Sequence, residues 1–368
     1  MSTNQNNYSR HNYFMSLALL QADFMLGNTK DNPSVGCVIT KNNNLISAGT
    51  TSYNGRPHAE VNAINFSKYD LKKSTIYTTL EPCSHYGKTP PCVKKIISRN
   101  IKRVFFSVND PDSRSYKKSK LYLTKKGIIV KNGLLHKEIS FFYKSYSNYK
   151  KRDLPYVTSK IAISKDFFTI NKNNKKWITN EYSRGRVHLL RSSNDCIITS
   201  AETVIKDNPL LNCRIRGLEN RSPTRIVLDK NLRISIKSKI LKSSKNIKTI
   251  IFYNKSNDEK IALLKKMRVE IIKVPLNEVG HLNLILVLKR IKKKGFSRVF
   301  LECGVNLTYQ FFKSNLINEF KLFISKSDLG KNGGGSFKKT FAFFLKKRGG
   351  NIEKVNLLGD QLISYRIK

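Results

Sequence analysis

Residues 79–92 read Thr-Leu-Glu-Pro-Cys-Ser-His-Tyr-Gly-Lys-Thr-Pro-Pro-Cys, and His58-Ala59-Glu60 precede them in the chain. A histidine and two cysteines offer the nitrogen and sulfur ligands that zinc prefers. Three protein ligands leave the fourth tetrahedral position open, as in catalytic rather than structural zinc sites. A bound zinc ion lowers the pKa of a water molecule to about 7. His58, Cys83 and Cys92 are therefore predicted to bind one zinc ion (Zn2+) per chain.

The order of these residues follows the pattern H-x-E, then P-C-x-x-C, that describes zinc deaminases of nucleobases. In that pattern Glu60 is not a ligand but the catalytic general acid and base. One difference is the spacing, because eight residues rather than two separate Cys83 from Cys92. A buried histidine, two free cysteines and a surface glutamate would each be ordinary alone. The complete ordered set, flanked by prolines, favours the catalytic interpretation.

The segments 79–92 and 32–38 (Asn-Pro-Ser-Val-Gly-Cys-Val) closely resemble the bifunctional deaminase/reductase family of riboflavin biosynthesis. The resemblance implies an N-terminal three-layer, cytidine-deaminase-like α/β domain and a C-terminal α/β domain like dihydrofolate reductase. It also implies two reactions: zinc-dependent hydrolytic deamination of the diaminopyrimidinone ribosylamine 5′-phosphate, then NADPH-dependent reduction of its ribosyl group to ribityl. Asn32 would hold the pyrimidine edge, and His85 or Lys88 would meet the polar substrate.

Two series of strands and helices are predicted on either side of the basic segment 150–152. The first series has strands at 35–40, 45–51, 76–80, 104–108 and 128–130, with helices over 13–25, from 58, over 91–100 and over 134–149. The second has strands at 156–163, 196–199, 225–228, 249–253, 269–273 and 298–302. Such alternation is typical of α/β folds. We therefore expect two α/β domains, 1–152 and 153–368.

The second half lacks a G-x-G-x-x-G fingerprint, so a standard Rossmann site is not predicted. The family resemblance continues there in 160–166, 177–179, 200–214 and 300–307. The residues that it places at the NADPH cofactor are Ala162, Trp177, Thr203, Asp207, Gly304, Val305, Asn306, Leu307, Thr308, Tyr309 and Gln310. Those that it places at the substrate are Lys175, Arg191, Leu211, Arg214 and Glu302. The glycine turn at 304 leads into a predicted helix, whose first N–H groups suit a phosphate.

Ordinary structural roles compete with these assignments. Trp177 would more often be a core aromatic residue, Arg191 would more often be solvated, and the glycine-rich segment 330–335 is expected to be a flexible loop. The chain also departs from the family at Phe167, where glycine is usual, and at Lys175, where serine is usual. A monofunctional deaminase with a decayed reductase half therefore remains an alternative.

The chain is strongly basic, with 69 Lys and Arg against 25 Asp and Glu, a formal net charge of +44. This charge favours a second alternative, a nucleic-acid base deaminase. However, the lysines are spread along the chain among asparagines, and we expect them to attract phosphorylated small molecules rather than a specific nucleic acid. A third alternative, a non-catalytic protein with structural zinc, would not need Glu60.

The six cysteines do not suggest a disulfide framework, because no secretory signal precedes them. The longest apolar runs, such as 282–288, are far shorter than the ~20 residues that a membrane helix needs. We expect a cytoplasmic homo-oligomeric enzyme with no membrane partner.

Overall fold

The computed structural model describes residues 2–172, 177–346 and 348–368. The chain divides into two compact units, Met1–Arg152 and Asp153–Lys368. Every helix in the described ranges is too short or too polar to span a lipid bilayer.

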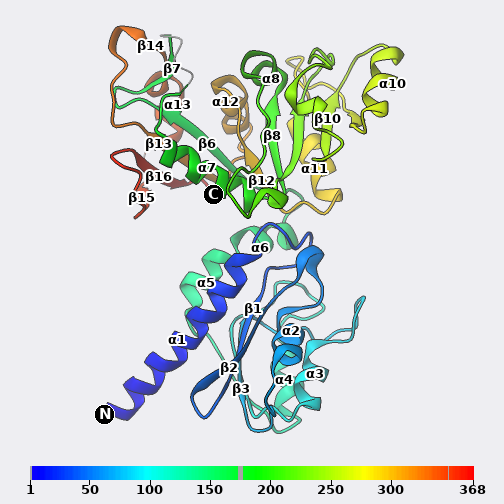
Figure 1. Ribbon diagram of the computed structural model, residues 1–368, viewed down its shortest axis with the longest axis vertical. Helices are drawn as coiled ribbons and strands as arrows, with labels where there is room; N and C mark the ends of the chain where they lie inside the picture. Colours follow the sequence, from blue (N-terminus) through cyan, green and yellow to red (C-terminus); the bar gives the residue numbers. More distant parts are fainter. Residues whose placement is uncertain (1, 173–176, 347) are drawn as a thin grey trace. The chain divides into compact units, whose positions relative to one another are not determined.

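The first unit contains six α-helices and five strands among its described residues (Figure 1). In chain order they are α1 (Ser2–Phe24), β1 (Gly36–Lys41), β2 (Asn44–Thr50), α2 (Ala59–Phe66), β3 (Thr75–Leu80), α3 (Cys92–Ser98), β4 (Arg103–Val108), α4 (Lys118–Thr124), β5 (Ile129–Asn132), α5 (His136–Phe142) and α6 (Lys144–Lys151). All five predicted strands are present. The helix predicted over 134–149 is instead two helices, interrupted at Tyr143.

One sheet with the order β2-β1-β3-β4-β5 forms the middle layer of this unit. β1 is antiparallel to β2 and β3, whereas β3, β4 and β5 are parallel. Helices α1 and α5 lie on one face of the sheet and α2, α3 and α4 on the other (Figure 1). The carboxyl ends of the parallel strands therefore meet the starts of α2 and α3, which is where α/β folds build their sites.

The first helix is longer than predicted. It begins at Ser2 rather than near residue 13. Met15, Ala18 and Ala22 are fully buried at helical spacing, but Tyr13 and Phe24 are exposed. Not every apolar residue within the predicted range 13–25 therefore faces the core.

The second unit contains seven α-helices and eleven strands among its described residues. They are β6 (Tyr156–Ile163), β7 (Phe168–Asn171), α7 (Glu181–Ser192), β8 (Cys196–Ser200), α8 (Ala201–Asp207), β9 (Thr224–Leu228), α9 (Lys239–Lys242), β10 (Thr249–Tyr253), α10 (Asp258–Lys266), β11 (Glu270–Lys273), α11 (Leu284–Lys293), β12 (Arg298–Leu301), α12 (Val305–Lys313), β13 (Glu319–Ile324), β14 (Gly333–Ser336), α13 (Phe337–Leu345), β15 (Gly350–Ile352) and β16 (Gln361–Arg366).

Nine of these strands form one sheet in the order β11-β10-β9-β8-β12-β6-β13-β16-β15. The sheet is parallel from β11 to β13, as the alternation of elements predicts, and β16 and β15 add an antiparallel edge. The carboxyl ends of β6, β8, β9 and β12 lie together along one edge of the parallel part, next to the starts of α8 and α12.

The glycine-rich segment 330–335 is not the flexible loop that the sequence predicts. Its last residues enter β14, which pairs with β7 in a separate two-stranded sheet. A Cβ atom on Gly333 would collide with the Phe168 ring. The glycine therefore permits the close approach of two segments that are distant in sequence.

Candidate active sites

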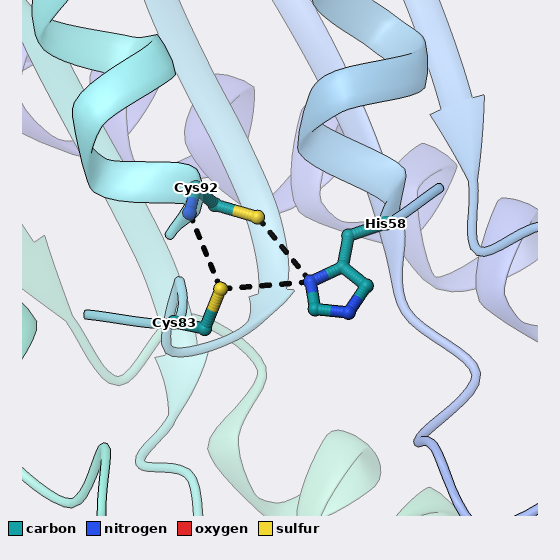
Figure 2. Close-up of side chains that lie close together, drawn as sticks. All are labelled: His58, Cys83 and Cys92. Carbon is teal, nitrogen blue, oxygen red and sulfur yellow. Dashed lines mark hydrogen bonds between the residues drawn. The ribbon is translucent and has the colours of Figure 1, made fainter. Parts of the chain in front are cut away.

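Three separate elements of the first unit bring His58, Cys83 and Cys92 together (Figure 2). His58 is the N-cap of α2 and Cys92 is the first residue of α3, while Cys83 follows the end of β3. Pro91 is the N-cap of α3, so this helix begins one position later than predicted. The fixed backbone angle of Pro91 directs the chain into the helix that presents Cys92.

The ligand atoms have the separations that tetrahedral zinc requires. Nδ1 of His58 lies 3.5 Å from Sγ of Cys83 and 3.4 Å from Sγ of Cys92. Zinc–nitrogen and zinc–sulfur bonds of ordinary length would place such atoms about 3.5 Å apart. All three ligand atoms lie within 4.8 Å of one another. The donor set and its spacing therefore fit one zinc ion with an open fourth position.

Local contacts prepare one of the thiols for metal binding. The hydrogen bond with Cys92, together with His58, lowers the pKa of the Cys83 thiol well below its usual range. The backbone N–H of Cys92 also donates to Sγ of Cys83 over 3.2 Å. Because the thiolate is the form that binds metals, these contacts favour the ligating state.

Glu60 lies in the first turn of α2 and is 3 % exposed. Its Oε2 atom is 3.4 Å from Sγ of Cys92. Burial raises the pKa of its carboxyl group to about 7. A buried carboxyl group beside the metal ligands but separate from them has the position of a general acid and base.

The insert between the cysteines is exposed around Tyr86 and Lys88. His85 is held at its Nδ1 atom by Oγ of Ser115 over 2.8 Å. Asn32 lies against Gly55, in the segment that leads to His58, where a Cβ atom on Gly55 would collide with the Asn32 side chain. The predicted substrate residues thus lie on segments that adjoin the metal ligands.

Glu81, which the sequence analysis did not select, organises the loop beside this site. Its buried carboxylate accepts the backbone N–H groups of Asp110, Lys117 and Ser119, and also the Ser119 hydroxyl group. The same loop carries Ser115, the partner of His85. The sequence does contain a signal for this role, because Glu81 stands between a buried strand and Pro82-Cys83. A charged residue at such a position is expected to be buried, and a buried charge needs hydrogen-bond partners.

In the second unit, a cavity of about 1320 Å³ opens at the carboxyl ends of the parallel strands. The predicted residues that line it are Trp177, Arg191, Thr203, Asp207, Leu211, Arg214, Glu302, Gly304, Val305, Asn306, Leu307 and Gln310. The described lining does not include Ala162, Thr308 or Tyr309. Thr308 is buried, and Tyr309 packs its ring against Phe344. Lys175 lies outside the described residues.

A buried ion-pair cluster forms one wall of this cavity. Nε and Nη2 of Arg191 donate to the two oxygens of Glu302 over 2.9 and 2.8 Å, and Nζ of Lys160 lies 3.4 Å from the same carboxylate. Burial opposes the charge of Glu302, but Arg191 and Lys160 outweigh it and hold its pKa at about 2. Arg191 is therefore not the solvated residue of the alternative interpretation. Lys160 was missed as a site residue, although a lysine within an apolar strand was its signal.

The structure also gives the surroundings of Trp177 and Thr203, two of the predicted cofactor residues. Trp177 is 54 % exposed and lies under the guanidinium of Arg184, so it is not a core aromatic residue. Oγ1 of Thr203 accepts the backbone N–H of Gly304 over 3.3 Å, which joins the start of α8 to the start of α12.

Comparisons with known proteins agree with both units. A family profile described as "Cytidine and deoxycytidylate deaminase zinc-binding region" matches residues 8–108, and one described as "RibD C-terminal domain" matches residues 155–344. The riboflavin biosynthesis protein RibD of Bacillus amyloliquefaciens is 35 % identical over 86 % of this chain and 85 % of its own length. The corresponding Escherichia coli protein is 30 % identical over 88 % and 89 %.

Solved structures give the same result. RibD of Acinetobacter baumannii superposes with a TM-score of 0.84 at 27 % identity, covering 98 % of this chain and 99 % of that one. A deaminase/reductase of Thermotoga maritima reaches 0.83 at 28 % identity, with the same coverage. Fold and site thus define a zinc-type deaminase domain joined to a reductase domain. The chain belongs to the RibD family and is a bifunctional deaminase and reductase of riboflavin biosynthesis.

Proposed function

We propose that the first unit hydrolytically removes an amine from the diaminopyrimidinone ribosylamine 5′-phosphate, with one zinc ion held by His58, Cys83 and Cys92. The observation that carries this proposal is the convergence of the three ligand atoms beside the buried Glu60. The Thermotoga maritima neighbour is described as a diaminohydroxyphosphoribosylaminopyrimidine deaminase, which supports this substrate.

Bound zinc would supply a water of lowered pKa as the nucleophile. Glu60 accepts a proton from that water at a carboxylate oxygen. Glu60 passes this proton to the ring nitrogen, then accepts the remaining proton of the newly bound hydroxyl group and gives it to the departing amine. Ammonia thus leaves, and a carbonyl group replaces the carbon–nitrogen bond. Asn32 orients the pyrimidine edge, and His85 or Lys88 meets the polar part of the substrate.

For the second unit we propose reduction of the ribosyl group to ribityl. A nicotinamide cofactor, when bound, supplies the hydride. Glu302, fixed by Arg191 and Lys160, orients the sugar hydroxyl groups, and Arg214 meets the phosphate. The cavity exceeds the ~300–1,000 Å³ that one ligand usually occupies, so it has room for cofactor and substrate together.

NADPH rather than NADH is the proposed cofactor because of the charges on one part of the cavity lining. Lys206, near the end of α8, and Lys230, Arg233 and Lys239, which follow β9 in the chain, line the cavity. We name these four residues the basic rim. Four cations suit the additional 2′-phosphate of NADPH. Replacing Lys230 and Arg233 by alanine should raise the KM for NADPH about tenfold and leave that for NADH unchanged.

The central experiment is product analysis of the purified full chain with the phosphorylated diaminopyrimidinone, with and without NADPH. We expect ammonia and the deaminated ribosyl compound without cofactor, and the ribityl compound with it. Supplying the deaminated intermediate directly and following NADPH absorbance tests the reductase alone. Ammonia release without any NADPH consumption would establish the monofunctional alternative.

We also propose that both steps act on small molecules in the cytoplasm and that the chain forms a homo-oligomer. The spread of the basic residues along the sequence supports the first point. Deamination of single-stranded nucleic acid by the purified protein would contradict the action on small molecules. Sedimentation analysis would test whether the chain forms a homo-oligomer.

A further inference from the structure

His188 joins α7 to the loop that follows α8. Its Nδ1 atom lies 3.2 Å from the backbone N of Arg214, 3.4 Å from Nη1 of Arg191 and 3.1 Å from the backbone oxygen of Asn212. His188 and Arg191 are three residues apart on one face of the helix, so both reach the same loop. One ring nitrogen thus touches Arg214, which the proposed function gives to the substrate's phosphate, and Arg191, which fixes Glu302.

The three contacts of this nitrogen select one tautomer. If Nδ1 carried a proton and donated it to Asn212, the N–H of Arg214 would face another donor. If the proton is on Nε2, Nδ1 accepts from Arg214 and from Arg191. The oxygen of Asn212 still accepts Nη1 of Arg191 over 2.9 Å. The Nε2–H tautomer therefore gives the Arg214 N–H an acceptor and leaves the Asn212 oxygen paired with Arg191.

The charges around the ring keep it neutral. Burial, and then the guanidinium groups of Arg191 and Arg214, lower the pKa of His188 to about 4, against smaller opposing effects of Asn212 and Glu302. An imidazolium group would add a third positive charge beside those of Arg191 and Arg214. His188 consequently acts as an acceptor at neutral pH.

We propose that His188 is a positioning residue of the reductase: its Nδ1 atom fixes the backbone of Arg214 against α7, so that the Arg214 side chain reaches the substrate's phosphate. Nη1 of Arg214 is held in turn by Oδ1 of Asn212 over 3.0 Å, and Arg214 lines the cavity. The assignment of the phosphate to Arg214 rests on the proposed function, whereas the contact between His188 and the Arg214 backbone does not.

The kinetic test compares His188→Leu with His188→Asn in the full chain. Leucine removes the acceptor, and we expect the KM for the deaminated intermediate to rise about tenfold while the KM for NADPH stays within about twofold. The Oδ1 atom of asparagine can take the place of Nδ1, so His188→Asn should retain a nearly normal KM. Leu189→Ala, at an exposed position on the same helix, is the matched control.

A double-mutant cycle shows whether the effect passes through Arg214. In an Arg214→Ala background, His188→Leu should change the KM for the intermediate by less than about twofold, because the positioned side chain is already gone. Full additivity of the two substitutions would overturn the proposal. So would an equal rise of the KM for the intermediate and the KM for NADPH in His188→Leu.

Amide hydrogen exchange tests the contact without any catalysis. The Arg214 N–H should exchange about tenfold faster in His188→Leu than in the wild type, and His188→Asn should restore its protection. Unchanged exchange in His188→Leu would refute the role of His188 even if the reductase is active. An inactive wild-type reductase would instead refute the proposed function and leave the exchange result to decide this inference.

Discussion

Replacing Glu302 by glutamine tests the energetic importance of the ion-pair cluster in the second unit. The ordinary pKa of the carboxyl group is 4.5, and the fall to about 2 corresponds to about 3 kcal/mol of stabilisation of the folded state. A second route gives a similar figure, because removing one partner of a buried ion pair costs about 3–5 kcal/mol. Arg191 is 8 % exposed and would lose its charged partner, and one of its two acceptors would become a donor NH2 group.

The sign of the pH dependence follows from the direction of the pKa change. Because the folded-state pKa lies below the ordinary value, the stabilisation is fully present above about pH 4.5 and is lost as the pH falls towards about 2. Glu302→Gln should therefore lower the free energy of unfolding by about 3 kcal/mol at pH 7, and the difference from the wild type should shrink in acid.

The assay is denaturant unfolding followed by tryptophan fluorescence. Trp177 is the single tryptophan of the chain and belongs to the second unit, so its signal reports on that unit. Glu202→Gln is a suitable control, since Glu202 is exposed and lines the same cavity. It should change stability by less than about 0.5 kcal/mol. Equal unfolding midpoints for Glu302→Gln and the wild type at pH 7 would refute the reasoning.

Three further predictions concern the metal site, the proton transfer and a helix end. Cys83→Ser and Cys92→Ser should each lose zinc by elemental analysis, whereas Cys37→Ser, in the core of the same unit, should retain it; full zinc in both variants would place the metal elsewhere. Glu60→Gln should keep its zinc but release ammonia ~10²–10⁴ times more slowly, and near-normal release would exclude the proposed proton transfer. Arg268, just after the end of α10, has a φ of 60°, where glycine avoids the steric cost. Arg268→Gly should thus raise the free energy of unfolding by about 0.5–1 kcal/mol, against a loss of about 1 kcal/mol for Ala262→Gly inside the helix; equal midpoints would show that Arg268 carries no strain.

The metal-site residues could be predicted because their signal is local. His58, Cys83 and Cys92 lie next to helix starts and a strand end that the sequence also marks, and the structure brings them together. The hairpin between β1 and β2 was predictable for a similar reason. Its turn residues Asn42 and Asn43 have φ angles of 51° and 64°, which asparagine tolerates well.

Features that depend on distant partners were not predictable. β13 was missed because Glu319 and Lys321 resemble surface residues, yet both are buried and paired with each other. β14 was missed because its partner β7 lies far away in the sequence, and glycine alone does not reveal the Phe168 ring that requires it. The position of Lys160 in an apolar strand was a sequence signal, but only the folded chain shows that its partner is Glu302.

The eight residues between Cys83 and Cys92 separate the predicted zinc ligands from the exposed residues of the same segment. Cys83 and Cys92 fix its ends, while residues between them, such as Tyr86 and Lys88, remain exposed to solvent. If the insert meets the substrate as proposed, substitutions at the tip should alter which molecules are accepted and leave the predicted zinc ligands in place. With a spacing of only two residues, both intervening residues would be held in the turn that joins the two cysteines, and neither could be replaced so independently. Under the proposed function, in which the insert meets the substrate, selectivity would be adjustable at its tip while the chemistry stays constant.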